Sequence, residues 1–212
     1  DGIDTAYSPS SSKYTLANQA IGAGHSTIGT SSITWTWSSG GAQTDFAYGN
    51  DSNTNAGTTT NTYWLESGLS ANTQYTFYVT ARNGNHIKCG SPISHSAYTA
   101  ASVPGAPMIT TNTVNSLFVD INPNGNPSNT TYAIRIDGGS YSNKYVQSNG
   151  SILDSAVYQT DSDWGNKAVT GLSANTQYTF DVKAKNGDGI DTAYSPSSSK
   201  YTLANQAIGA GH

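Results

Sequence analysis

The sequence predicts an all-β protein made of two tandem β-sandwiches, preceded by a strand segment without a domain of its own. Three observations support this prediction. Short runs alternate hydrophobic and polar residues, the motif GLSANTQYTF occurs at 68–77 and at 171–180, and the first 25 residues recur unchanged as the last 25. Alternation is typical of half-buried strands, and no run has helical periodicity long enough to predict a helix.

Residues 1–25 are identical to residues 188–212, so one sequence stands at two places 187 positions apart. Copies that had diverged by evolution would differ at exposed positions, which packing does not constrain. We therefore interpret 187 residues as the period of a repeating polypeptide. On this interpretation 1–25 is the last strand and linker of a preceding repeat, and 206–212 is the linker to the next.

The N-terminal copy carries few large hydrophobic residues, chiefly Ile3, Tyr7, Tyr14 and Leu16. A strand with so little to bury and an unpaired edge is not stable alone. We expect these residues to contact a neighbouring copy. Two alternatives remain open: separate chains exchange this strand, or the duplication is artificial and its first copy is a loose tail.

The first domain is expected at 26–103. Residues 33–37 and 75–81 alternate hydrophobic and polar side chains, which predicts two strands. The dipeptide Asn83-Gly84 then predicts a hairpin turn, because both residue types tolerate positive φ.

The second domain is expected at 104–205, after a joint that contains prolines. The dipeptide Asn186-Gly187 repeats the hairpin signal of the first domain, and the last strand is expected within 188–203. Alternation predicts three earlier strands: 117–121, 132–136 and 178–184.

The stretches at 68–84 and 171–187, each reading GLSANTQYTF and then V-A-N-G with intervening residues, resemble fibronectin type III domains. In that family a tyrosine at a corner of the sandwich bonds back to the backbone of the preceding loop. The resemblance assigns core roles to four residues: the corner tyrosines Tyr75 and Tyr178, and the preceding leucines Leu69 and Leu172.

The run SITWTW is similar to the second strand of that family, whose Trp packs in the core. The resemblance carries this role to Trp37, with Trp35 as the alternative. The second domain has no Trp in the corresponding strand, so we expect Trp164 to fill its core. Phe77 and Phe180, two residues after the corner tyrosines, are also expected in the two cores.

Composition excludes several classes of function. The net charge is −4 and the nine Lys and Arg are scattered, so nucleic acid is not an expected partner. No apolar run is long enough for membrane insertion. Only 10% of residues are charged, against about 25% in an average domain. This composition resembles secreted bacterial structural modules, and we expect an extracellular or cell-surface location.

No arrangement of residues predicts a catalytic site, a cofactor or a metal site. His86 and His95 flank Cys89 but lack the spacing of a tetrahedral metal site. Loop carboxylates could bind Ca²⁺, although such residues are usually solvated; they are Asp161, Asp163, Asp188 and Asp191.

Two kinds of recognition site remain as alternatives. The Asn186-Gly187-Asp188 turn could display an adhesion sequence. Exposed aromatic rings could stack on sugars, although such rings more often lie buried in contacts; the candidates are Tyr63, Trp64, Tyr78 and Tyr141.

The sequence therefore predicts a non-enzymatic structural repeat of an extracellular fibre, stalk, sheath or surface appendage. Its expected partners are copies of itself, with a cell surface or polysaccharide as further candidates. The alternative is a spacer or a binding module, for carbohydrate or adhesion, in a secreted enzyme or adhesin.

Overall fold

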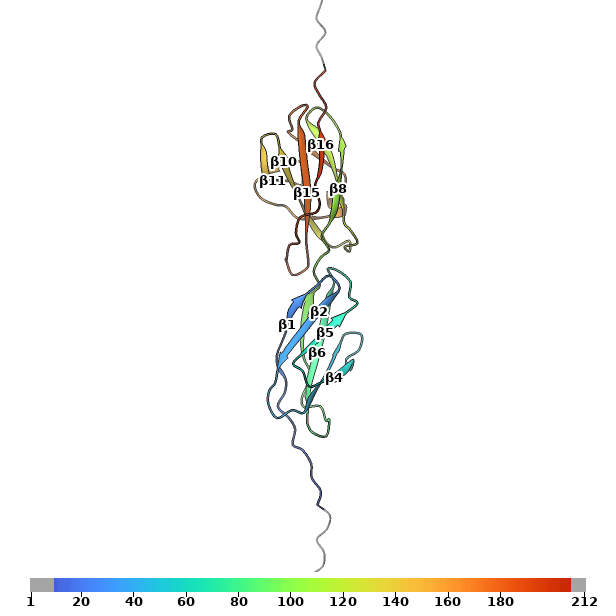
Figure 1. Ribbon diagram of the computed structural model, residues 1–212, viewed down its shortest axis with the longest axis vertical. Helices are drawn as coiled ribbons and strands as arrows, with labels where there is room; N and C mark the ends of the chain where they lie inside the picture. Colours follow the sequence, from blue (N-terminus) through green and yellow to red (C-terminus); the bar gives the residue numbers. More distant parts are fainter. Residues whose placement is uncertain (1–9, 207–212) are drawn as a thin grey trace, which may run out of the picture. The chain divides into compact units, whose positions relative to one another are not determined.

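The computed structural model of the 212-residue chain describes residues 10–206. Ile3 and Tyr7, like nearly all of the expected linker 206–212, lie outside the described residues. The chain divides into two compact units (Figure 1). The first comprises Asp1–Thr27, Thr34–Glu66 and Tyr75–Ser96, and the second comprises Ile28–Ile33, Ser67–Gln74 and Ala97–His212.

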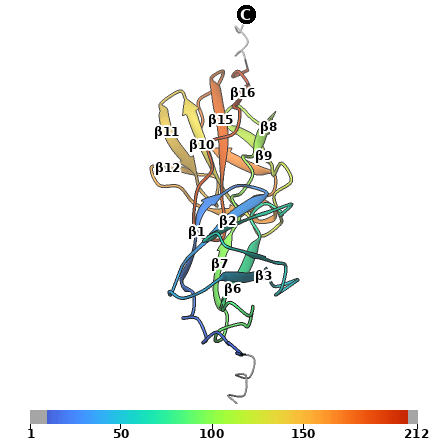
Figure 2. The ribbon, with the colours of Figure 1, turned by 60° about the horizontal axis from the view of Figure 1, so that its bottom comes forward.

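Strands β1 to β7 form the two sheets of the first sandwich. One sheet has the strand order β1-β2-β5 and the other the order β4-β3-β6-β7; Figure 2 shows β1 beside β2. The strands are β1 Ile21–Ile28, β2 Ser32–Ser38, β3 Asp45–Asn50, β4 Gly57–Thr59, β5 Tyr63–Ser67, β6 Gln74–Arg82 and β7 Ile93–Tyr98.

The core of the first sandwich is built around Phe77 of β6, which is fully buried. Both tryptophans of β2 are buried beside it, as the alternation predicts. The ring of Trp35 stacks on Phe77 at a centroid distance of 5.5 Å, and that of Trp37 at 5.2 Å. The family resemblance implies one core Trp, whereas this core contains two. Leu69 and Tyr75 are half-buried.

Strands β8 to β16 form the second sandwich. One sheet has the order β14-β9-β8, and the other has the order β12-β11-β10-β15-β16, with β13 also paired to β10. The elements are β8 Gly105–Thr111, β9 Ser116–Asn122, β10 Thr131–Gly138, β11 Tyr141–Val146, β12 Ile152–Leu153, β13 Gln159–Thr160, α1 Asp161–Trp164, β14 Lys167–Thr170, β15 Gln177–Lys185 and β16 Ser198–Tyr201.

Trp164 fills the core of the second sandwich, as the sequence predicts. Its Nε1 donates to the backbone oxygen of Tyr132 at 2.8 Å. Leu172 and Phe180 are buried in the same core. Tyr178 is buried too, and its hydroxyl oxygen accepts a hydrogen bond of 2.9 Å from the backbone N–H of Ser173, five residues earlier.

The helix α1 was not expected from the sequence. It is a single turn, too short to show a periodicity of 3.6 residues. Thr160 caps its start, with Oγ1 accepting from the backbone N–H of Asp163 at 3.2 Å. The turn carries Trp164 into the core, and this burial explains why the segment is ordered.

The two copies of the repeated segment differ in structure where both are described. Ser198–Tyr201 form β16, whereas residues 11–14, which have the same sequence, form no strand. β16 pairs with β15 through four residue pairs. Sequence alone therefore does not make this segment a strand, and the neighbouring strand β15 does.

The first sandwich begins earlier than residue 26. β1 starts at Ile21, so residues 21–25, which were assigned to the preceding repeat, belong to a sheet of the first sandwich. The residues just before β1 also pack there. The backbone N–H of Ala17 donates to Sγ of Cys89 at 3.1 Å, and that of Asn18 to the backbone oxygen of Gly41 at 3.1 Å. Tyr14 and Leu16 are 67% and 64% exposed.

The two Asn-Gly turns lie where the sequence predicts them, but the reason given for them is wrong. Positive φ falls at His86 and Gly189 and not at the Asn-Gly pairs. In the second turn Oδ1 of Asn186 accepts from the backbone N–H groups of Asp188 and Ile190, at 3.1 and 2.8 Å. The asparagine side chain thus stabilises the turn from inside.

Candidate interaction site on the second sandwich

The polar face of β15 carries a dense set of charged residues. Asp181, Lys183 and Lys185 alternate with core residues, so they lie on the face of the sheet opposite to the core. In the neighbouring strand β10, Arg135 stands directly opposite Asp181. Two strands thus place cations and a carboxylate side by side.

Arg135 and Asp181 form a two-point ion pair. Nε and Nη2 of Arg135 donate to the two carboxylate oxygens at 2.9 and 2.5 Å. Asp181 is buried although the alternation predicts a solvated residue, because the guanidinium covers it. The hydrogen bond that Arg135 donates to Asp181 raises the pKa of Arg135.

Asp191 follows the Asn186 turn and lies against these cations. Its carboxylate accepts from Nζ of Lys183 at 2.6 Å and from the hydroxyl of Tyr158 at 2.7 Å. Lys185 lies 3.6 Å away. Burial alone would raise the pKa of Asp191, but the hydrogen bonds from Lys183 and Tyr158 bring it below the ordinary value.

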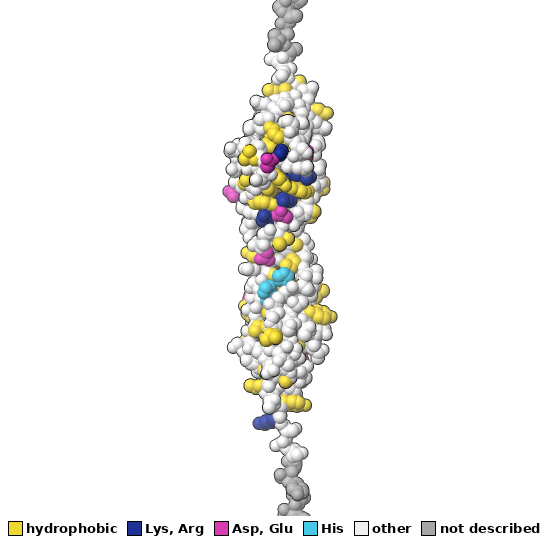
Figure 3. Space-filling model, turned by 90° about the vertical axis from the view of Figure 1, so that its left-hand side faces the viewer, with side chains coloured by type: hydrophobic (Ala, Val, Ile, Leu, Met, Phe, Trp, Pro, Cys, Tyr) yellow, Lys and Arg dark blue, Asp and Glu magenta, His cyan; other side chains and the backbone are white. Residues whose placement is uncertain are grey.

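Tyr194 completes the site. Its hydroxyl lies 2.7 Å from the hydroxyl of Tyr145, and the guanidinium carbon of Arg135 lies 4.0 Å from the centre of its ring. Burial and the bond to Tyr145 raise the pKa of Tyr194 to about 12. On the face drawn in Figure 3, basic, acidic and hydrophobic side chains gather over the second sandwich.

We call this set the tyrosine–cation cluster. The sequence analysis missed it, although alternate basic residues in a chain with so few charges are a signal that could have located it. The cluster holds the segment after the turn on the sheet by charge and by ring contacts. Its members are Arg135, Tyr145, Tyr158, Asp181, Lys183, Lys185, Asp191 and Tyr194.

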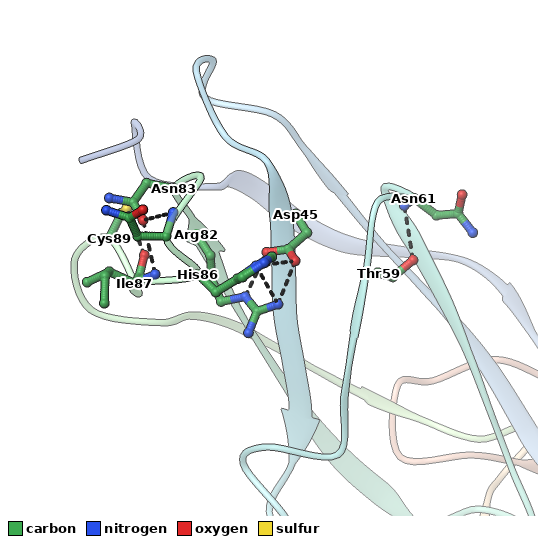
Figure 4. A network of polar contacts seen from close by, with 9 residues as sticks. Asp45, Thr59, Asn61, Arg82, Asn83, His86, Ile87 and Cys89 are labelled. Atoms are coloured by element: carbon green, nitrogen blue, oxygen red, sulfur yellow. Dashed lines mark hydrogen bonds and ion pairs between the residues drawn. The ribbon is translucent and has the colours of Figure 1, made fainter. Parts of the chain in front are cut away.

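Cys89, His86 and His95 each have a different partner, and Figure 4 draws the first two. Nδ1 of His86 lies 3.1 Å from a carboxylate oxygen of Asp45, which also binds Arg82. Sγ of Cys89 is buried and donates to the backbone oxygen of Ile87 at 3.3 Å. His95 instead lies against His25, with ring nitrogens 3.1 Å apart. Among residues 10–206, no three His, Cys, Asp or Glu side chains gather to hold a metal ion.

The four candidate calcium carboxylates stand in different surroundings. Asp161 and Asp163 stand in the single turn of α1, and Asp191 is neutralised by Lys183. Asp188 is exposed at the Asn186 turn, where Asn186 itself is buried. The turn therefore exposes only Gly187 and Asp188 of the possible adhesion tripeptide.

The four candidate sugar-stacking rings do not share a surface. Tyr63 and Trp64 are successive residues of β5 and point to opposite faces. Trp64 packs on Tyr48 with ring centroids 4.7 Å apart. The hydroxyl of Tyr78 donates to Asp51 at 2.8 Å, and that of Tyr141 donates to the backbone of Gly171 at 3.0 Å.

Nothing in the described part of the chain is a helix of the length and apolarity that a membrane span requires.

The chain was compared with known proteins. No family model matches it, and no curated protein does. Among solved structures, a two-domain fibronectin type III segment of chicken tenascin matches with a TM-score of 0.56 and 16% identity, over 87% of this chain and 100% of that one.

Two longer arrays also match. The central fibronectin-III array of RIM-binding protein has a TM-score of 0.34 and 15% identity, over 91% of this chain and 71% of that one. The FN1–FN3 domains of chicken CNTN1 have a TM-score of 0.39 and 18% identity, over 89% and 68%. At such identities the likeness concerns the fold. With the tenascin segment as the guide, the described chain has the fold of two tandem fibronectin type III-like β-sandwiches.

Proposed function

We propose that this chain is a non-enzymatic structural repeat of an extracellular array, such as a bacterial fibre, stalk, sheath or surface appendage. Copies follow one another with a period of 187 residues. In the array, residues 1–16 lie on the second sandwich of the preceding copy. The observation that carries the proposal is the exact recurrence of residues 1–25 at 188–212, together with the different structures of the two copies.

The different structures of the two copies support the proposal that the N-terminal copy needs a neighbouring copy. Ser198–Tyr201 pair with β15, while residues 11–14 have the same sequence and no strand partner. A preceding repeat would supply the missing strand. Identical side chains would then make identical contacts.

The packing before β1 supports a defined joint between repeats. Ala17 and Ala20 are buried against the first sandwich, and Asn18 binds the backbone of Gly40 and Gly41. The same Leu-Ala-Asn-Gln-Ala sequence recurs at 203–207. In an array, that second copy would enter the first sandwich of the next repeat in the same way.

Hydrogen exchange in a chain extended by one period tests the proposal. Such a chain contains the 25-residue segment three times. We expect the middle copy, which follows a complete second sandwich and precedes a complete first sandwich, to be protected along its whole length, and the first copy to exchange faster. A middle copy that exchanges as fast as the first would contradict the proposal.

Electron microscopy of longer chains tests the array itself. We expect rods whose length grows by a constant increment with each period. Flexible chains of separated particles would favour the alternative function, a spacer or a binding module for carbohydrate or adhesion. Antibody labelling of intact cells of the source organism tests the extracellular location.

A further inference from the structure

The segment after the Asn186 turn is held on β15 by a specific set of hydroxyl groups. The backbone N–H of Thr192 donates to the backbone oxygen of Ala184 at 2.8 Å, and Oγ1 of Thr192 accepts from the N–H of Ala184 at 3.0 Å. Ser195 makes the same two bonds with Val182, at 2.7 and 3.0 Å. A side-chain hydroxyl thus takes the place of a backbone carbonyl in each pair.

Charged groups and aromatic rings also hold this segment. Asp191 binds Lys183 and Tyr158, and Tyr194 binds Tyr145 and lies under Arg135. The residues that bind are therefore the acid, the hydroxyls and the tyrosine of the pentapeptide Asp-Thr-Ala-Tyr-Ser at 191–195. We call 188–203 the latch and this pentapeptide its recognition motif.

The first sandwich has a related backbone arrangement without this chemistry. The N–H of Cys89 donates to the backbone oxygen of Ala81 at 2.9 Å, as Thr192 does to Ala184. The residues at the positions of the recognition motif differ, however. With the offset of 103 residues between the repeated motifs, Asp191, Thr192, Tyr194 and Ser195 correspond to Lys88, Cys89, Ser91 and Pro92.

The receiving strands differ as well. Lys183 corresponds to Thr80, and Asp181 corresponds to Tyr78. Arg135 stands opposite Asp181 in β10, and Gly49 stands opposite Tyr78 in β3. The first sandwich therefore lacks both the lysine and the arginine that hold the recognition motif.

The same motif stands at 4–8 in the N-terminal segment, as Asp4, Thr5, Ala6, Tyr7 and Ser8. We infer that the part of the tyrosine–cation cluster outside the latch, chiefly Arg135, Tyr145, Tyr158 and Lys183, binds the Asp-Thr-Ala-Tyr-Ser motif of a second copy when the chain's own latch is displaced. The second sandwich is thus a selective site for a peptide of this chain, and the first sandwich is not. The inference rests on the proposed function only in naming a second copy as the occupant.

Exchange between copies replaces each contact with an identical one, so the bound states are equal in contact energy. The chain's own latch has the advantage of a high effective concentration, because it is covalently attached. Weakening the latch should let the N-terminal segment of another chain occupy the site. Because the donor segment and the site are different parts of the chain, such binding is head-to-tail and can continue into open assemblies.

Paired variants of the full chain test this inference. Asp191→Ala with Tyr194→Ala weakens the latch, and Asp4→Ala with Tyr7→Ala is the matched change in the other copy. We expect sedimentation to show assembly of the latch variant at concentrations where the N-terminal variant stays monomeric. Combining all four substitutions should abolish the assembly. Equal sedimentation of the latch variant and the fourfold variant, with both folded by circular dichroism, would overturn the inference.

A labelled peptide of residues 1–16 gives a readout that does not depend on assembly. We expect it to bind the fourfold variant, whose own motifs are both disabled. The same peptide with Tyr7→Ala should bind at least about tenfold more weakly. Equal binding of the two peptides would overturn the inference even if the array holds. Selective binding of the peptide would support the inference even if hydrogen exchange of the extended chain contradicts the array.

Discussion

Nε1 of Trp35 donates a hydrogen bond of 2.7 Å to Oε2 of Glu66, and both residues are buried. The second carboxylate oxygen of Glu66 accepts from Nδ2 of Asn50. The core of the first sandwich therefore contains a carboxylate that depends on two neutral donors. Trp37 differs, since its buried Nε1 has no hydrogen-bond partner among the described residues.

This difference gives a matched pair of substitutions. Trp35→Phe removes a donor from a buried carboxylate, which costs about 1–3 kcal/mol beyond the loss of packing. Trp37→Phe removes a donor that has no described acceptor. We expect Trp35→Phe to lower the free energy of unfolding more than Trp37→Phe by about that amount, as measured by urea denaturation. Equal losses would show that the bond to Glu66 contributes nothing.

Close packing at Gly40 should hold the joint before β1 in place. A Cβ added at Gly40 would lie 1.9 Å from the backbone oxygen of Gln19, so Gly40→Ala must displace residues 14–20. We expect faster hydrogen exchange at Asn18 and a loss of about 1–3 kcal/mol in stability. Gly24→Ala is the control, because its Cβ would come no closer than 3.7 Å to another residue. Similar exchange in the two variants would contradict the tight joint.

The raised pKa of Tyr194 should be visible in an alkaline titration. Burial and the bond to Tyr145 raise this pKa from 10 to about 12. Since the folded protein holds this proton more tightly, the contribution of Tyr194 to stability is complete below pH 10 and is lost as the pH rises toward 12. We expect the absorbance of tyrosinate to show a late step that Tyr194→Phe removes. Tyr63→Phe, a change at an exposed ring, should leave that step intact.

Asp45 should make the first sandwich sensitive to acid. The hydrogen bond from Arg82 lowers the pKa of Asp45 below its ordinary value of 3.8, against the opposing effect of burial. Its contribution is therefore present above that value and is lost as the pH falls through the lowered pKa. We expect Asp45→Asn to be less stable than the wild type at neutral pH. The melting temperatures should converge in acid, whereas Asp154→Asn, at an exposed ion pair, should change little at either pH.

Local patterns predicted the central strands well, because alternation reports directly which face of a strand is buried. Ile33, Trp35 and Trp37 are all buried, and so are Leu117, Val119 and Ile121. Trp164 was placed in the second core because the strand there that corresponds to 33–37 has no Trp. These features depend on the residue's own strand and on the size of the core it must fill.

Features that depend on distant partners were not predicted. The start of β1 at Ile21 depends on pairing with β2, and the Gly-rich sequence there gives no alternation. Asp181 reads as a solvated residue until Arg135 is placed opposite it. The tyrosine–cation cluster joins β10, β11, β15 and the latch, which only the folded sheet brings together.

The hydroxyl bonds of Thr192 and Ser195 also fix the register of the latch on β15. Each hydroxyl pairs with one N–H of β15, and the two contacts are three residues apart along the latch. A slip that moves each position to the next residue along the latch would present Ala193 and Pro196 to the same two N–H groups, and neither side chain can accept a hydrogen bond. This slipped register is thus rejected chemically, and in the proposed array the same selection would help to keep the spacing between one repeat and the next constant.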